Sequence, residues 1–503
     1  MPHLAGPYHN VIFILAGLSC AFAAHARQGE PPRSFSQRAK SAVIVPIEEI
    51  SPIDVARTRA ESDARAHIVG PHTKRMQVAV GTTVAIDPAR NGIWTVLADG
   101  SALWRVSVRA RGATDLRLGF ARYALPPGAT LHVIGSGNYY QGPFTTADAI
   151  DGRFEAPVIP GDTATIELHV PDPTTFPTDA LELDSVGAGF RDRFGLAKTD
   201  SSELGASGAC NVNVACPLGQ PYADVARAVG QYEVRADDSR NYFLCTGTLV
   251  ADVPRDRRNY FLTAAHCVTS ASEAASMVIY WNYQSTRCNQ LSAPAGGYLN
   301  DNQQGAVLRA TRADVDFSLV ELSQTPDPAW NVHYNGWNAT GAIPVATIGI
   351  HHPSGDVKKV TKGSAAAIIS SCISDTPTAS NTHWETGPYA YGTTENGSSG
   401  SGLFVAMSDR NQARLLIGTL SGGDAGCSST VPSQPNAGTD CYGRLSIAWN
   451  GTSAATRLRD WLDPANTSAT SITGADIVSP ADRLPAHSRR PIPAILLRAN
   501  AHP

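Results

Sequence analysis

Two short segments, far apart in the 503-residue chain, constrain its fold most: TAAHC at residues 263–267 and GSSGS at residues 397–401. The first carries His266, and the second carries three serines and two glycines. A serine hydroxyl is a poor nucleophile until a neighbouring imidazole accepts its proton, and the oxyanion that then forms needs backbone N–H donors. The two segments therefore predict a fold that brings a histidine base against a serine nucleophile.

The glycines of the second segment indicate which serine is the nucleophile. Ser399 has Gly397 two residues before it, so the N–H groups of residues 397 and 399 can converge on one oxygen. Ser398 and Ser401 have no glycine at that position. We therefore predict Ser399 as the nucleophile, with the N–H groups of Gly397 and Ser399 forming the oxyanion hole.

The third catalytic group should be a carboxylate that holds the imidazole in the right tautomer. Asp316 opens the apolar run FSLVEL, which is typical of a buried strand, whereas the alternative, Asp314, lies two residues farther from it. The chain order His266, Asp316, Ser399 is that of chymotrypsin-like proteases, because subtilisins and α/β-hydrolases carry their triads in other orders. The predicted fold is accordingly all-β, with two antiparallel β-barrels of the chymotrypsin-like serine protease type.

From about residue 207 to residue 464 the chain resembles the secreted bacterial lysyl endopeptidases. The matching stretches are GACN at 208–211, YFLT at 260–263, VIYWNY at 278–283, IHHP at 350–353, YGR at 442–444 and DWLDP at 460–464. The resemblance implies the same triad and places the acidic residue that receives the substrate's basic side chain at Asp440. A buried carboxylate of this kind is stable mainly when a cation completes it, because an unpaired buried charge is costly.

The segment that forms the pocket wall departs from the family pattern. The family has a histidine before its Gly-Gly pair, whereas this chain has Ser421 before Gly422 and Gly423, and no tryptophan precedes Cys372 to stack against it. An aromatic pair favours a slim lysine stem, so its loss predicts a wider pocket. We therefore expect cleavage after lysine and also after arginine, at rates within about tenfold because a stack contributes at most ~1–2 kcal/mol.

The cysteines indicate an exported domain. Of nine, Cys20 falls in the N-terminal segment and the other eight lie from Cys210 onward, without the C-x₂-C spacing of zinc sites. We therefore expect disulfides and no metal. The resemblance implies the pairs Cys210–Cys427, Cys216–Cys288 and Cys245–Cys267, and the two remaining cysteines predict a fourth pair, Cys372–Cys441.

The chain divides into four parts by composition and resemblance: a signal peptide at 1–26, a β-rich propeptide at 27–198, the protease domain at 199–464 and a partly disordered tail at 465–503. The resemblance implies that the propeptide assists folding and inhibits the enzyme within the same chain, although an accessory domain that stays attached is the alternative. The family's junction maps to Leu204 and Gly205, but Leu204 is not basic. Lys198 is the better site for self-cleavage, which predicts a mature chain beginning at Thr199.

Charge and composition exclude some functions. The chain has 40 basic and 44 acidic residues, which argues against nucleic acid as a partner. We expect a secreted monomer without a cofactor, acting on proteins and peptides that contain basic residues, and free of the membrane after signal removal. A catalytically inactive homologue that binds basic peptides is the alternative function.

Overall fold

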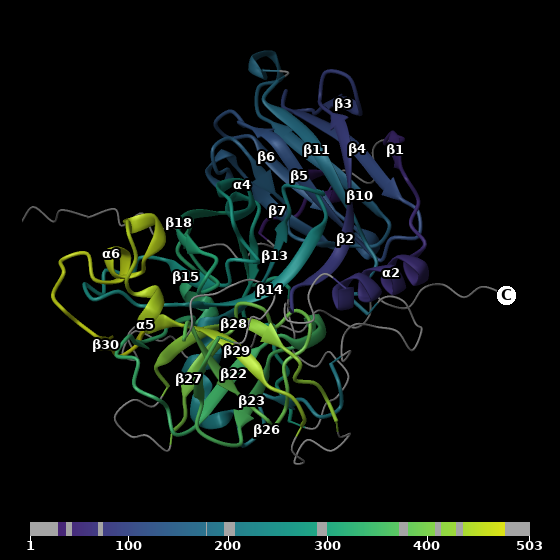
Figure 1. The fold of residues 1–503 in the computed structure, drawn as a ribbon. Coiled ribbons are helices and arrows are strands. Elements are labelled where there is room, and N and C mark those ends of the chain that lie inside the picture. The colour runs from purple at the N-terminus through teal and green to yellow at the C-terminus, as the bar shows by residue number, and fades with distance from the viewer. Residues whose placement is uncertain are drawn as a thin grey trace, which may run out of the picture.

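The computed structural model is built almost entirely of β-strands, in an N-terminal domain that lies against two β-barrels (Figure 1). In Figure 1 the N-terminal domain is purple to blue, and the barrels run from teal to yellow below it. The described residues are 29–36, 43–68, 74–177, 179–195, 207–288, 299–371, 381–407, 414–428 and 436–477.

The N-terminal domain consists of strands in two sheets around one apolar core. Strand β4, with the sequence ALWRVSVRA, contributes Val106 and Val108 to this core, and β10 contributes Ile166 and Leu168. Full burial of each such side chain contributes about 1.5–3 kcal/mol to folding. These aliphatic runs form strands because branched side chains pack well on a pleated surface.

The strands of the N-terminal domain pair in two groups. The first sheet is, in spatial order, β1 (Ile47–Ile50), β4 (Ala102–Ala110), β10 (Thr163–Val170), β6 (Thr130–Ile134) and β7 (Tyr140–Phe144), with β3 (Ile93–Val96) beside β4. The second group is β2 (Met76–Ile86), β11 (Leu181–Gly189), β5 (Asp115–Tyr123) and β8 (Phe154–Glu155), with β9 (Ile159–Pro160) beside β5. The helices of this domain are α1 (Arg33–Ser36) and α2 (Val55–Ile68).

The first barrel is a nearly closed antiparallel sheet with its own core. Its strands, in spatial order, are β17 (Asn302–Gln304), β16 (Val278–Tyr280), β13 (Val229–Arg235), β14 (Tyr242–Leu249), β15 (Tyr260–Thr263), β19 (Phe317–Leu322) and β18 (Ala306–Arg312). Helices α3 (Ala223–Ala228) and α4 (Ala271–Ala275) accompany it. Strand β19 begins directly after Asp316, and β15 ends just before the turn that carries His266.

The second barrel carries the serine and the predicted pocket. Its strands, in spatial order, are β12 (Val212–Asn213), β23 (Lys359–Gly363), β22 (Thr347–His351), β27 (Gly402–Val405), β28 (Leu416–Gly423), β29 (Asp440–Arg444), β25 (His383–Thr386) and β24 (Ile368–Ser370). Strand β26 (Tyr389–Tyr391) pairs with β23, and β21 (Trp337–Asn338) pairs with β28. The barrels therefore match the predicted fold class.

The described chain ends in short helices and strands. Helices α5 (Leu445–Ala448) and α6 (Arg459–Leu462) pack on the barrels. Within the segment predicted as a tail, β30 (Ser471–Ile472) pairs with β21, and β31 (Ala475–Asp476) pairs with β20 (His333–Tyr334). A strand of two residues is too short to show an alternation of apolar and polar side chains, so the sequence pattern does not indicate β30 or β31.

Strand β2 joins the N-terminal domain to the first barrel in one continuous sheet. It pairs with β11 of its own domain and also with β14 of the barrel, with Met76 opposite Leu244 and Ala79 opposite Tyr242. A backbone ladder of this kind fixes both the distance and the register between two domains. Lys74 and Arg75, directly before β2, thereby contact the second barrel at Asp440 and the first at the His266 carbonyl.

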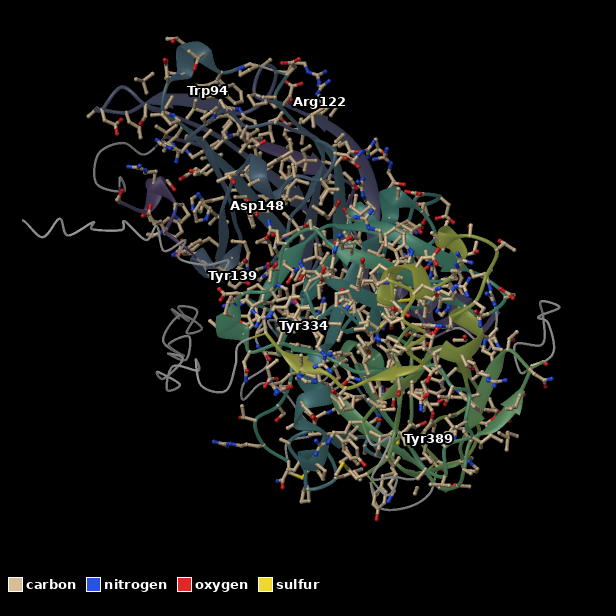
Figure 2. All side chains as sticks on the ribbon, turned by 90° about the vertical axis from the view of Figure 1, so that its left-hand side faces the viewer. Trp94, Arg122, Tyr139, Asp148, Tyr334 and Tyr389 are labelled. Atoms are coloured by element: carbon tan, nitrogen blue, oxygen red, sulfur yellow. A yellow bond between two sulfur atoms is a disulfide. The ribbon has the colours of Figure 1, made fainter. Side chains whose placement is uncertain are left out.

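Buried charges add to this interface. The Glu233 carboxylate of β13 lies 2.6 Å from Arg117 Nε of β5 and also pairs with Arg193. Farther along, Tyr139 donates to Asn300 and Gln324 donates to Asp148, on the side of the N-terminal domain that faces the barrels (Figure 2). The buried pairs of Glu233 with the two arginines require both partners, because removing one leaves an uncompensated charge.

Candidate active site

The three residues predicted as a triad form one hydrogen-bonded chain. His266 Nε2 lies 2.8 Å from Ser399 Oγ, and His266 Nδ1 lies 2.8 Å from Asp316 Oδ2. The backbone N–H of His266 donates to the other Asp316 oxygen at 2.9 Å. Two barrels are needed for this contact, because His266 and Asp316 belong to the first and Ser399 to the second.

Asp316 stays charged although it is buried. Burial would raise the pKa of its carboxyl group, but the charge of His266 and the two hydrogen bonds from His266 outweigh burial, so the pKa lies below its usual value. The Ser421 hydroxyl also donates to this carboxylate and lowers its pKa further. A charged Asp316 holds a proton on His266 Nδ1 and leaves Nε2 free to accept one.

The turn before Ser399 has the conformation that the predicted oxyanion hole needs. Gly397 has a φ of 95°, which is in the left-handed region, and a Cβ atom at this position would lie 2.8 Å from the carbonyl oxygen of His352. Only glycine fits both conditions. The turn directs the N–H groups of Gly397 and Ser399 toward one carbonyl oxygen, that of Lys74.

Asp440 is enclosed by polar groups. It is fully buried at the start of β29, and its Oδ2 accepts hydrogen bonds from Tyr389 at 2.8 Å and from the Thr394 hydroxyl at 2.6 Å. Its Oδ1 lies 2.7 Å from the Nζ atom of Lys74. The carboxylate is thus paired with a lysine ammonium, the kind of partner that its burial requires.

The sequence prediction did not include Lys74. Its ammonium also donates to the Thr394 hydroxyl at 2.5 Å, to the Ala425 carbonyl at 3.0 Å and to the Thr394 carbonyl at 3.3 Å. The signal available in the sequence was its rarity, because only six of the 40 basic residues are lysine. Lys74 is one of these six lysines. It stands between α2 and β2 of the N-terminal domain and belongs to neither element.

The residues predicted as the pocket wall lie next to Asp440. Gly422 and Gly423 of β28 stand opposite Cys441 and Asp440 of β29. A Cβ atom on Gly423 would lie 2.5 Å from Asp440 Oδ1, so a side chain there would crowd the carboxylate. Ser421 replaces the family's histidine, and its hydroxyl lies 3.3 Å from the ring of His383.

His383 is the second residue that the sequence prediction did not include. It belongs to β25, next to β29, and burial lowers its pKa to about 4. The ring is therefore neutral at physiological pH and acts as a hydrogen-bonding partner of Ser421. Nothing in the local sequence marks it, since its position depends on the pairing of β25 with β29.

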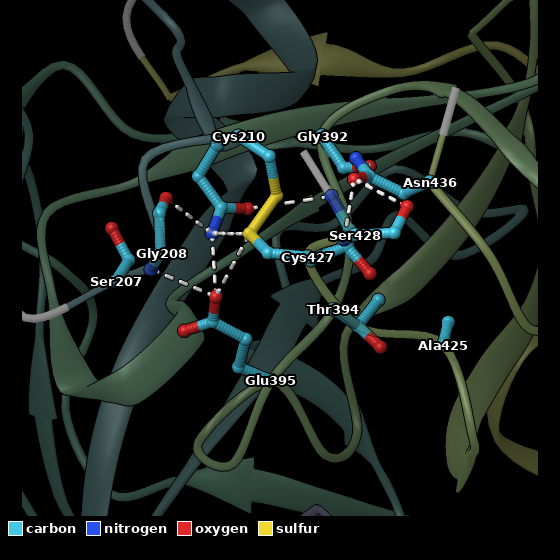
Figure 3. The surroundings of a disulfide bond; sticks show 12 residues. Ser207, Gly208, Cys210, Gly392, Thr394, Glu395, Ala425, Cys427, Ser428 and Asn436 are labelled. Carbon is cyan, nitrogen blue, oxygen red and sulfur yellow. Dashed lines mark hydrogen bonds between the residues drawn. A yellow bond between two sulfur atoms is a disulfide. The ribbon is translucent and has the colours of Figure 1, made fainter. Parts of the chain in front are cut away.

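The disulfides whose two cysteines are both described join the first three predicted pairs: Cys210 to Cys427, Cys216 to Cys288 and Cys245 to Cys267. Figure 3 shows Glu395 beside the first bridge, with Thr394 and Ala425 on the adjoining segments. Glu395 accepts from the backbone N–H of Gly208 at 2.9 Å. The bridge therefore braces two segments whose oxygens surround the Lys74 ammonium.

Several predicted features lie outside the described residues. They are the signal peptide at 1–26, the junction residues Lys198, Thr199, Leu204 and Gly205, the tail beyond residue 477, and Cys372. Cys441 is itself disulfide-bonded, and its predicted pairing with Cys372 stays a prediction.

The described segments contain neither a group of three or more histidine, cysteine or acidic side chains that could hold a metal ion, nor a helix long and apolar enough to cross a membrane.

Comparison with known proteins agrees with this geometry. Residues 204–443 match the model of the lysyl endopeptidase C-terminal domain, and residues 49–186 match that of the lysyl endopeptidase N-terminal domain. A lysyl endopeptidase of Pseudomonas aeruginosa is 29% identical over 479 residues, which cover 87% of this chain and 98% of the relative.

Two solved structures are more distantly similar. A protease from M. tuberculosis in its active form is 14% identical, with a TM-score of 0.28, over 44% of this chain and 78% of that one. An HtrA-type protease with a decapeptide is 14% identical, with a TM-score of 0.30, over 46% of this chain and 64% of that one. At these TM-scores the likeness carries no argument.

Both matched family domains occur in the expected order and together span most of the chain, and the second contains the histidine, the aspartate and the serine that the fold brings together. The chain belongs to the lysyl endopeptidase family of serine endopeptidases.

Proposed function

We propose that this chain is a secreted endopeptidase that hydrolyses peptide bonds after lysine through an acyl-enzyme on Ser399. The observation that carries the proposal is the position of Lys74: its ammonium pairs with Asp440 while its carbonyl oxygen accepts from the backbone N–H groups of Gly397 and Ser399. One lysine thus occupies both the pocket and the oxyanion hole, as the residue before a cleaved bond must.

The proposed roles follow from the hydrogen bonds. His266 Nε2 accepts the proton of Ser399 Oγ as that oxygen attacks the carbonyl carbon, and Asp316 stabilises the imidazolium that results. The N–H groups of Gly397 and Ser399 stabilise the oxyanion. His266 then gives the proton to the leaving amine, and a water molecule hydrolyses the ester by the same route in reverse.

The shape of the pocket supports lysine rather than arginine as the preferred residue. The Lys74 ammonium has three N–H donors and faces four oxygens, from Asp440, Ala425 and Thr394. A guanidinium is wider and has five donors in a fixed plane, so the same oxygens do not satisfy it.

The distribution of lysine in the chain supports the same preference. From residue 199 onward the only lysines are residues 358, 359 and 362, and the first two are buried, with 1% and 2% of their surface exposed. Arginine is abundant there, and Arg255, Arg257 and Arg258 are exposed in one loop. An enzyme that cut well after arginine would digest this loop of its own.

We therefore expect kcat/KM for peptides with lysine before the cleaved bond to exceed that of matched arginine peptides by on the order of 10²-fold. A lost hydrogen bond to a charged group costs about 1.5–3 kcal/mol, which corresponds to this ratio. The assay varies only that one residue in an otherwise constant peptide. Rates within tenfold would instead favour the wider pocket expected from the missing aromatic pair.

Labelling with a serine-reactive phosphonate separates an enzyme from an inactive homologue that only binds basic peptides. The proposed enzyme should be labelled at Ser399, and its His266→Ala variant should not, because the hydroxyl then has no base. A chain that binds lysyl peptides without being labelled would be such a homologue.

Export fits the three disulfides, which persist in oxidising compartments. In this proposal, the start of the mature domain is not fixed by an ion pair between its new N-terminal amine and a carboxylate next to the nucleophile. The residue before Ser399 is Ser398, whose hydroxyl bonds His351, and burial lowers the pKa of His351 to about 3, so this partner is neutral. Cys210 and Gly208 fix the start of the domain instead.

Because the residue before the nucleophile is a serine and not an aspartate, no carboxylate at that position calls for a particular first residue. The release site is therefore free to be the nearest lysine, Lys198. We expect the secreted enzyme to begin at Thr199, after cleavage at Lys198, unless another protease trims it further. N-terminal sequencing of the secreted protein measures this. A Ser399→Ala precursor that still matured at Thr199 when expressed alone would rule out self-processing.

A further inference from the structure

The bond between Lys74 and Arg75 lies in the active site in the manner of a substrate. The Lys74 N–H donates to Ser399 Oγ at 2.9 Å, and the Lys74 carbonyl oxygen accepts from the N–H groups of Gly397 and, at 3.4 Å, of Ser399. The Lys74 N–H thus meets the nucleophile while the carbonyl oxygen of the same residue lies at the two N–H donors, so the carbonyl group of Lys74 is placed beside Ser399. The side chain is buried in the pocket with only 7% of its surface exposed.

The residues after this bond are held as firmly as those before it. The Arg75 guanidinium donates to the His266 carbonyl at 3.0 Å and lies 3.9 Å above the ring of Phe243. Directly afterwards, Met76 and Gln77 of β2 pair with β14. A peptide fixed on both sides of its scissile bond presents a high effective concentration to the nucleophile.

The segment before the bond is anchored independently of it. Helix α2 leads toward Lys74, and its Asp63 pairs with Arg191, which follows β11. Strand β1 is paired with β4 along its whole length. A chain cut between residues 74 and 75 would therefore keep both of its new ends attached to the N-terminal domain.

We propose that Lys74–Arg75 is a processing site that the active site cuts within its own molecule, and that the cut N-terminal domain stays docked and keeps Lys74 in the pocket. The inference rests on the proposed function. Cleavage after Lys74 is a separate event from release at Lys198, because the pocket at Asp440 cannot hold both lysine side chains at once. Release at Lys198 then requires Lys74 to leave the pocket or a second, already active molecule.

The chemistry of this step is that of the proposed reaction. A bond forms between Ser399 Oγ and the carbonyl carbon of Lys74, and the bond from that carbon to the Arg75 nitrogen breaks. The serine proton passes through His266 to the Arg75 nitrogen, which becomes the new N-terminal amine. One water molecule then hydrolyses the ester and leaves a carboxylate on Lys74.

The test uses the full chain with Lys198→Gln, which removes the expected release site. Mass spectrometry and N-terminal sequencing of denatured samples should give one fragment that ends at Lys74 and one that begins at Arg75. The half-time should not change over about 100-fold dilution, because the reacting groups belong to one molecule. The fragments should elute together from a sizing column under native conditions.

Matched variants of this chain identify the groups responsible. Adding Ser399→Ala or Lys74→Gln should abolish the cut, whereas Lys40→Gln, at another lysine of the N-terminal region, should leave it unchanged. The Lys74→Gln variant should be labelled by a phosphonate on the order of 100-fold faster than its Lys198→Gln parent, since a tethered occupant at high effective concentration no longer competes.

The outcomes separate this proposal from the proposed function. The proposal is wrong if the mature enzyme cleaves lysyl peptides while the Lys198→Gln chain stays uncut at Lys74. A rate that rises with concentration, or a cut chain labelled as fast as Lys74→Gln, also overturns it. If the mature enzyme is neither labelled nor active on lysyl peptides, the proposed function itself fails.

Discussion

Replacing Ser399 with alanine should lower kcat/KM by at least about 10⁴-fold, the loss expected for a member of a catalytic triad. The hydroxyl is the only group that the variant removes, and its partner His266 keeps its bond to Asp316. Stability should therefore change little. Peptidase assays measure the first effect, and denaturant unfolding of the precursor measures the second.

Ser401→Ala is the matched control. Ser401 lies two residues away and is also buried, and among the described residues its hydroxyl has no hydrogen-bond partner. The control should retain activity within about tenfold, as expected for a residue outside the reacting groups. A recognition sequence for an unrelated protease, inserted before residue 199, matures all variants alike. If Ser401→Ala or Ser398→Ala were the inactive variant, the nucleophile would be assigned to the wrong serine.

Asp440→Asn should lower kcat/KM for lysyl peptides by about 10²- to 10⁴-fold, because an ammonium left buried without its carboxylate costs ~3–5 kcal/mol. The asparagine has the shape of the aspartate and can still accept from the Tyr389 and Thr394 hydroxyls. The effect should thus fall on substrates that carry a cation. The measurement compares the rate of hydrolysis of lysyl peptides with the rate of labelling by phosphonates without a basic group. Only the first rate should fall.

Asp424→Asn is a control for the charge alone. Asp424 follows the pocket wall but is exposed, and it accepts from the Thr439 N–H. Asp424→Asn removes one negative charge near the site, as Asp440→Asn does. Because exposed charges are screened by solvent and salt, kcat/KM should change by no more than about threefold. Equal losses in the two variants would mean that the pocket attracts lysine only through its general negative field.

The reacting groups could be predicted from the sequence because each of them requires particular residue types at neighbouring positions. A glycine two residues before the nucleophile and an aspartate at the start of an apolar strand are visible in the chain itself, and the fold places Gly397 and Asp316 where those patterns suggest. The pocket at Asp440 and the first three cysteine pairs came from the resemblance, since no local rule links residues so far apart.

Lys74 could not be predicted in this way. It is separated from Asp440 by 366 positions, and its place depends on the pairing of β2 with two sheets at once. The alternation in β2 indicates a strand but does not say which strands lie beside it. For the same reason, the contact between His383 and Ser421 could be seen only after strands β25, β28 and β29 were in register.

The pairing between β2 and β14 also bears on which proteins this enzyme can attack. In the proposed release of the N-terminal domain, the backbone N–H and C=O groups of Tyr242, Phe243 and Leu244 lose the partners that Ala79, Gln77 and Met76 gave them. An extended peptide crossing the site in the direction of β2 restores those bonds whatever its side chains are. With the proposed preference for lysine, we expect cleavage at lysines in extended or unfolded segments, and protection of a lysine inside an intact helix until the helix unwinds.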